Sequence, residues 1–242
     1  MKIKKIRNAL IVILAVIFLI STFNIIKITY DYKLAEKTNS KLQEQYVQEI
    51  SPTNDEEKLQ MSINIDFDAL KQKNSDITGW IYCPDTPINY PVVQGKDNNQ
   101  YLRTDLQGKY LASGTIFVDY RNGNIGDDRN YIVYGHNMKN GTMFGTMVKY
   151  KEQSYYDAHP ILYFLTPECN YIIELCAGAV INRDSNIYQQ SPDTKTVENI
   201  ISKSTFLSNT KITESDNLIT LSTCSYEFNN ARYVLLGKLN KI

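Results

Sequence analysis

The 242-residue sequence lacks the common motifs that bind nucleotides and catalytic metals. It contains no G-x-x-x-x-G-K-[ST] loop, no G-x-G-x-x-G turn and no H-E-x-x-H pair. G-x-S-x-G, which marks the nucleophile of many serine hydrolases, is also absent. Its four cysteines form no C-x-x-C pair, and its two histidines are not at zinc-ligand spacing from them. We therefore expect no metal site, no cofactor and no disulfide-stapled scaffold.

The chain also lacks an excess of charge of either sign. It has 26 Lys and Arg against 26 Asp and Glu, which excludes a strongly basic nucleic-acid binder. The charges are unevenly distributed, however, because residues 1–27 hold five positive charges and no negative one. The remainder is therefore acidic by about five charges. A charge asymmetry between the ends of a chain indicates targeting.

The N-terminal segment predicts a membrane anchor. Residues 9–20 are an unbroken apolar run, and residues 8–27 supply the roughly 20 mostly apolar residues that a spanning helix needs. The alternative is a cleaved signal peptide, which has a shorter apolar run followed by small residues, whereas residues 23–26 (Phe-Asn-Ile-Ile) make a poor cleavage site. We expect an uncleaved single-pass anchor over residues 1–27, with a cytoplasmic N-terminus and the rest of the chain outside the membrane.

Two further regions follow the anchor. Residues 28–78 are polar with helix-like spacing in places, which predicts a linker with one membrane-proximal helix and one or two short helices. A break is expected at residues 51–54, because Pro52 stops a helix. Residues 79–242 are the expected main domain.

The main domain has the pattern of a mainly β protein. From Trp80 onward, eight short apolar or alternating runs lie between turn residues, which is typical of a mostly antiparallel sheet or barrel. Peripheral helical pieces are expected at about residues 142–150, 154–158 and 194–204. The eight runs are residues 80–82, 88–93, 115–118, 131–134, 161–165, 171–181, 218–223 and 232–239.

With the other motifs absent, cysteine is the candidate nucleophile. Cys83, Cys169 and Cys176 have the ordinary interpretation of small apolar residues. Cys224 differs because it ends the run of residues 218–223, where a strand gives way to polar residues. A side chain at a strand end can be held by the sheet and still be open to substrate, and a thiol suits acyl transfer.

Two other residues could complete such a site. If the last two strands pair around position 228, Cys224 lies opposite Arg232 on the same face. An arginine there could stabilise an oxyanion, orient a substrate carbonyl or lower the thiol pKa, although a surface cation is the ordinary alternative. His136 follows a strand and could act with Cys224, whereas His159 precedes Pro160 in a polar loop.

These residues carry a resemblance to a known family. Residues 220–224 (Thr-Leu-Ser-Thr-Cys) resemble the T-L-x-T-C signature of sortases, the cysteine transpeptidases of Gram-positive bacteria, and residues 134–138 (Tyr-Gly-His-Asn-Met) resemble the sortase histidine segment. Arg232, eight residues after the cysteine, matches the family arginine. Class B resemblance extends over residues 60–240 and includes the segments 88–94, 97–102, 114–121 and 143–144.

The resemblance implies a fold and a reaction. Sortases fold as an eight-stranded β-barrel, here with N-terminal helices and a helix in the long segment before the cysteine strand. They cut a sorting motif near the C-terminus of a secreted protein after its Thr, and form a thioester that an amine of a cell-wall precursor or of a pilin resolves. Cys224 would be the nucleophile, His136 the general acid for the leaving amine, and Arg232 would hold the substrate or the developing oxyanion.

The resemblance also implies a peptide groove. Asn98, Leu102, Tyr134 and Ser222 match class B positions that line it, although Leu102 could equally be a core residue and Asn98 a turn former. Glu227 is a weaker candidate for substrate contact. The acidic cluster that binds calcium in another sortase class has no clear counterpart in this sequence.

Three alternatives stay open at the level of the sequence. A papain-like protease is disfavoured because its cysteine precedes its histidine, whereas His136 precedes Cys224 here. A sortase-like pilin polymerase would share the site and differ in its acceptor amine. A membrane-anchored peptide-binding protein without catalysis would keep the fold and not depend on Cys224.

Overall fold

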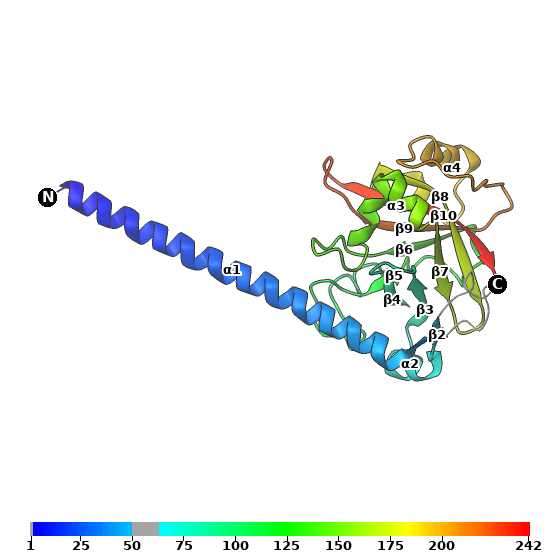
Figure 1. Cartoon of the computed structure of the whole chain (residues 1–242), viewed down its shortest axis with the longest axis horizontal. Helices are drawn as coiled ribbons and strands as arrows, with labels where there is room; N and C mark the ends of the chain where they lie inside the picture. The colour runs from blue at the N-terminus through cyan, green and yellow to red at the C-terminus, as the bar shows by residue number, and fades with distance from the viewer. Residues whose placement is uncertain (1, 50–62) are drawn as a thin grey trace.

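A long helix, α1 (Lys2–Tyr46), opens the chain (Figure 1). The computed structural model describes residues 2–49 and 63–242. No glycine or proline interrupts residues 2–46, so the helices expected on either side of residue 27 form one continuous helix. By length and composition α1 could cross a membrane, and its apolar window is not buried inside the molecule.

The last turns of α1 dock on the rest of the chain. Ala35 and Leu42 are buried, and Nε2 of Gln43 donates a hydrogen bond to the carbonyl of Asn89 at 2.7 Å. Two short antiparallel strands follow, β1 (Val47–Glu49) and β2 (Ile63–Ile65). The break predicted at residues 51–54 lies outside the described residues.

A short helix, α2 (Phe67–Lys73), lies between β2 and the main sheet. Its N-terminus is capped by Asp66, whose side chain accepts a hydrogen bond from the backbone N–H of Ala69 at 3.0 Å. Leu70 is the buried residue of this helix. This is one of the short helices predicted between residues 28 and 78.

Eight strands close into a barrel, as the family resemblance implied. Each of the eight predicted runs forms one of them, in the spatial order β10-β8-β7-β3-β4-β5-β6-β9. Most neighbouring pairs are antiparallel, while β4–β5 and β6–β9 are parallel. The strands are β3 (Ile77–Tyr82), β4 (Asn89–Gln94), β5 (Ile116–Val118), β6 (Asn130–Tyr134), β7 (Ile161–Leu165), β8 (Asn170–Asn182), β9 (Leu218–Cys224) and β10 (Ala231–Lys241).

The barrel has apolar clusters inside and outside. Ile81, Val133 and Leu221 belong to the largest cluster and are completely buried. A second cluster joins Leu42 of α1 to Trp80 of β3, so the N-terminal elements cover part of the outside of the barrel. Each fully buried side chain of this size contributes roughly 1.5–3 kcal/mol to stability. The strands that carry the candidate site are thereby held rigidly.

Short helices lie around the barrel near the predicted places. They are η2 (Gly145–Lys151), α3 (Gln153–Ala158), η3 (Asn186–Tyr188) and α4 (Thr194–Ile201). The first predicted helix is a 3₁₀-helix that begins three residues later than expected. Val197 and Ile200 of α4 are buried together with residues of β8, which explains why this segment stays on the barrel.

Candidate active site

The candidate nucleophile lies at the end of β9. In the hairpin of β9 and β10, Cys224 pairs with Arg232, and the ladder continues regularly to Leu218 opposite Lys238. The register expected from the sequence is therefore confirmed. Directly opposite residues of an antiparallel pair project from the same face, so the thiol and the guanidinium share one face of the barrel wall.

The His136 segment is fastened to the Cys224 segment from both sides. β6 runs parallel to β9, with Tyr134 opposite Ser222. The N–H of Gly135 donates to the carbonyl of Ser222 at 3.1 Å, and Oγ1 of Thr223 donates to the carbonyl of Gly135 at 2.8 Å.

Beyond the histidine, Nδ2 of Asn137 donates to the carbonyl of Cys224 at 2.7 Å. Residues immediately before and after His136 are thus bonded to the three residues that end β9. Parallel neighbouring strands end on the same side of a sheet, which is why two segments far apart in sequence meet here.

A groove of about 790 Å³ opens at this end of the barrel. All seven site residues expected from the sequence line it, including the two, Asn98 and Leu102, that had good structural alternatives. Leu102 is 39% exposed, so the interpretation as a core residue is wrong. The seven are Asn98, Leu102, Tyr134, His136, Ser222, Cys224 and Arg232.

The surroundings of His136 lower the pKa of its imidazole. Burial lowers the pKa of its imidazole below the ordinary value of 6.5, and the nearby positive charge of Arg103 lowers it further. Arg232 is half-buried, and within the described part of the chain its guanidinium donates one hydrogen bond, from Nη1 to the carbonyl of Ala231 at 2.9 Å. A guanidinium has five N–H donors, so Arg232 retains donors for a ligand in the groove.

Tyr188 is a groove residue that the sequence reasoning missed. Its hydroxyl is 2.8 Å from Oγ of Ser222, and its ring stacks on Tyr134 with the centroids 6.0 Å apart. Burial raises the pKa of Tyr188 to about 12, so the phenol stays neutral and able to donate. Nothing distinguished it in a sequence with 18 tyrosines. It ends η3, the short helix after β8, and lines the groove there.

The other candidate residues lie elsewhere. The thiols of Cys83 and Cys176 are buried, and Sγ of Cys176 donates to the carbonyl of Leu236 at 2.9 Å. Cys169 lies in the turn between β7 and β8. The ring of His159 lies against that of Tyr155 in a tilted arrangement, with the ring centroids 4.6 Å apart. These residues do not line the groove.

Glu227 is engaged away from the groove. Its carboxylate accepts hydrogen bonds from Nζ of Lys151 and from the hydroxyl of Ser225, and these bonds hold its pKa at about 2. The loop between β9 and β10 is thereby tied to the end of η2. Within the described residues, no group of three or more His, Cys, Asp or Glu side chains could hold a metal ion.

Comparison with known proteins identifies the family. The model of the sortase domain matches residues 81–240, which contain the barrel from the end of β3 to the next-to-last residue of β10. The chain belongs to the sortase family. A sortase B of Listeria monocytogenes is 38% identical over 177 residues, which cover 70% of this chain and 72% of the relative. A sortase B of Staphylococcus aureus is 30% identical over the full length of both chains.

Solved structures agree with the sequence relatives. The crystal structure of sortase B from Bacillus anthracis in complex with AAEK1 matches with a TM-score of 0.74 and 33% identity, and covers 88% of this chain and all of the other. The protein is therefore a class B sortase and a cysteine transpeptidase. The eight-stranded barrel is the sortase fold.

Proposed function

We propose that this sortase cleaves the C-terminal sorting motif of secreted proteins after a Thr and transfers them to an amine of a cell-wall peptide. Cys224 is the nucleophile of this reaction, His136 its proton donor and Arg232 its ligand for the substrate or the oxyanion. The observation that carries the proposal is the fastening of the His136 segment to the end of β9, where Cys224 faces Arg232. A thiol, an imidazole and a guanidinium thereby line one groove, which supports the proposed roles.

The chemistry of the first half-reaction follows from these groups. The thiol proton of Cys224 passes to His136, and the resulting thiolate attacks the carbonyl carbon of the substrate Thr, whose oxygen gains negative charge. Arg232 lies opposite Cys224, where its spare N–H donors can stabilise that oxygen or hold the peptide. Protonated His136 gives its proton to the leaving amine as the peptide bond breaks. The product is a thioester and a free C-terminal fragment.

The second half-reaction reverses the roles. An incoming amine attacks the thioester carbon, loses a proton to His136 and displaces the thiolate of Cys224. Transfer requires the amine to be positioned ahead of water, because both can resolve the thioester. The proposed acceptor is the peptide of a lipid-linked cell-wall precursor, and a lysine of a pilin subunit is the alternative acceptor.

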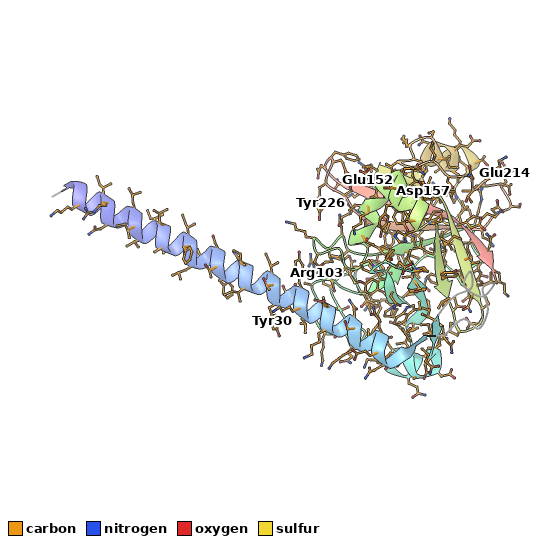
Figure 2. The ribbon with its side chains drawn as sticks, viewed as in Figure 1. Tyr30, Arg103, Glu152, Asp157, Glu214 and Tyr226 are labelled. Atoms are coloured by element: carbon orange, nitrogen blue, oxygen red, sulfur yellow. The ribbon has the colours of Figure 1, made fainter. Side chains whose placement is uncertain are left out.

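The N-terminal helix supports a membrane location. The helix α1 is long and apolar enough to span a bilayer, and four positive charges precede its apolar part, at residues 2–7. Positive flanks favour a cytoplasmic N-terminus, which puts the barrel outside the membrane. In Figure 2, Arg103, which lines the groove, lies on the side of the barrel toward which α1 extends. That side suits substrates and acceptors that arrive from the membrane.

A peptide panel tests the proposed function. Residues 28–242 are incubated with fluorogenic peptides copied from the C-terminal sorting regions of secreted proteins of the same organism, with and without a nucleophilic amine. We expect cleavage after Thr and, with the amine, ligation. Cys224→Ala should abolish both activities, whereas Cys169→Ala, a matched loss of a half-buried thiol outside the groove, should retain them.

The outcomes separate the alternatives. Hydrolysis without any ligation would identify a protease, and activity that survives Cys224→Ala would identify a different nucleophile. Ligation to a pilin lysine peptide in preference to a wall peptide would replace the proposed acceptor and leave the mechanism intact. Absence of cleavage for every peptide of the panel would favour a binding protein.

A further inference from the structure

One carboxylate belongs to the lining of the substrate groove, although its residue has no exposed surface. It is that of Asp119, which follows β5. Arg121 donates to it three times: from its backbone N–H to Oδ1 at 3.0 Å, from Nε to Oδ1 at 2.8 Å and from Nη2 to Oδ2 at 2.8 Å. The hydroxyl of Tyr134 donates to Oδ2 at 2.9 Å, and Nδ2 of Asn98 donates to Oδ2 at 3.1 Å.

The donors are themselves the wall of the groove. Asn98, Arg121 and Tyr134 all line it, and they come from three separate segments of the chain. Asn98 lies in the loop after β4, Tyr134 ends β6, and Arg121 follows β5. A single buried carboxylate therefore joins three groove residues that have no other common partner among the hydrogen bonds of the described residues.

A carboxylate imposes a direction on each of these hydrogen bonds. An ionised carboxylate only accepts, so the Tyr134 hydroxyl must donate to it and keeps its oxygen lone pairs for the groove. Nδ2 of Asn98 must also face Asp119, while Oδ1 of Asn98 accepts from the backbone N–H of Tyr120 at 3.1 Å. The orientation of the amide is thus fixed at both ends.

The carboxylate stays ionised in this place. Burial alone would raise the pKa of Asp119, but the hydrogen bonds from Arg121, Tyr134 and Asn98 outweigh burial and hold the pKa below its ordinary value. The pKa of the Tyr134 phenol is raised, by burial and then by the negative charge of Asp119. Both effects preserve the donor-to-acceptor direction throughout the neutral range.

We propose that Asp119 is the positioning residue of the peptide groove: it fixes the orientation of Asn98 and Tyr134 and thereby sets substrate affinity, without touching the reacting atoms. This inference rests on the proposed function, because it assigns Asn98 and Tyr134 to peptide binding. The wall continues from Tyr134 to Tyr188 by ring stacking and from Tyr188 to Ser222 by a hydrogen bond. Cys224 lies two residues beyond Ser222, so the chemistry is separated from Asp119 by several side chains.

Steady-state kinetics of Asp119→Asn tests the inference. The variant keeps the shape of the side chain but offers an amide that can donate as well as accept, so Asn98 and Tyr134 lose their fixed orientation. With the peptide that the unaltered enzyme cleaves fastest, we expect KM to rise about tenfold and kcat to stay within about twofold, as loss of a charged hydrogen-bond partner at a binding site implies.

Asp128→Asn is the matched control. Asp128 also accepts from an asparagine and a backbone N–H, namely Nδ2 of Asn122 at 2.9 Å and the N–H of Gly123 at 3.0 Å. It lies in the loop between β5 and β6 and does not line the groove. We expect both kinetic constants of this variant to equal those of the unaltered enzyme.

A double-variant background separates positioning from general support of the fold. In Asn98→Ala/Tyr134→Phe the two oriented donors are absent, so adding Asp119→Asn should raise KM by no more than about twofold. If Asp119→Asn does not fold, Tyr134→Phe alone removes one donor and leaves Arg121 on the carboxylate. KM should then rise several-fold with kcat retained.

The possible results have distinct meanings. An unchanged KM in Asp119→Asn, an equal loss in Asp128→Asn, or the same tenfold rise in the double-variant background would overturn the inference while the enzyme remains a sortase. For the second variant, an unchanged KM in Tyr134→Phe would overturn it in the same way. An unaltered enzyme that cleaves no peptide of the panel would contradict the proposed function and this inference together.

Discussion

Among the single residues of the site, His136 shows most directly how the fold acts on the chemistry. Burial and the charge of Arg103 both disfavour the imidazolium and lower its pKa. In the intact enzyme this titration is coupled to that of the Cys224 thiol, so the observed pKa values belong to the pair. The isolated effect of the environment on His136 is therefore best measured with the thiol removed.

NMR titration of Cys224→Ala provides this measurement, with His159→Gln used to assign the two histidine signals. We expect His136 to titrate below 6.5 because its charged form is desolvated. Adding Arg103→Gln should move the pKa part of the way back, since burial is the larger cause. A His136 pKa above 6.5 in Cys224→Ala would contradict the account of its environment.

The same shift has a consequence for stability. Because the pKa of His136 is lower in the folded state, the unfolded state binds more protons between the two values. The contribution of His136 to the free energy of unfolding is therefore present above pH 6.5, the pKa of an unfolded-state histidine. It is lost as the pH falls through the lower pKa of the folded state. Urea unfolding of Cys224→Ala should give a lower free energy of unfolding at pH 5 than at pH 7. Adding His136→Gln in the same background should make this difference between the two pH values smaller.

At the scale of elements, the junction of β6 with the His136 loop is closely packed. A Cβ atom on Gly135 would lie 2.5 Å from Cδ1 of Ile116 and 2.6 Å from Cδ2 of Phe144. Both neighbours are completely buried, so neither side chain can move aside. Only glycine lets β6 pass this point and deliver His136 to the groove.

Gly135→Ala should therefore affect stability and catalysis together. We expect the free energy of unfolding to fall by about 1–3 kcal/mol, as overpacking of a core does, and kcat to fall because His136 is the next residue. The control is Gly95→Ala, whose Cβ would meet the terminal oxygen of the Gln100 side chain at 3.0 Å rather than two completely buried side chains. Thermal unfolding and ligation kinetics measure both effects, and an unperturbed Gly135→Ala would show that the junction is not tightly packed.

The elements also show what could be predicted from the sequence. The eight strands were predictable because each is a short run between turn residues, and the pairing of Cys224 with Arg232 followed from a symmetrical hairpin. The β1–β2 pair was not predicted, because its two strands lie in the polar segment of residues 28–78, whose spacing favours helices. The roles of Tyr188 and Asp119 were also missed, because their contacts with Ser222, Tyr134 and Asn98 depend on how the barrel closes.

At the scale of the whole molecule, α1 has two different halves. Figure 2 shows its side chains before and around Tyr30 standing free of the barrel, and Tyr30 is 64% exposed. Farther along the helix, Leu42 is buried in the cluster that contains Trp80. Nδ2 of Asn39 also lies 3.6 Å from Sδ of Met143, in the loop that follows His136. The second half of α1 thus contacts the barrel near the site.

We expect this second half to contribute to the stability of the catalytic domain. In residues 28–242, Leu42→Ala should lower the free energy of unfolding by about 2–4 kcal/mol through the cavity it leaves. Tyr30→Ala, on the free half of the same helix, should change it by no more than about 0.5 kcal/mol. Urea unfolding compares the two. Equal effects of the two variants would mean that α1 does not dock on the barrel in solution.

The central claim is that Cys224 carries the peptide as a thioester. Its most direct test mixes residues 28–242 with a sorting peptide that the enzyme cleaves, without an added amine, and quenches the reaction with acid. The intact mass then shows whether an adduct has formed, and proteolytic mapping locates it. We predict an adduct equal to the peptide fragment that ends in Thr, located on Cys224 and released by hydroxylamine. An adduct on another residue, or peptide cleavage by Cys224→Ala at the unaltered rate, would contradict the account.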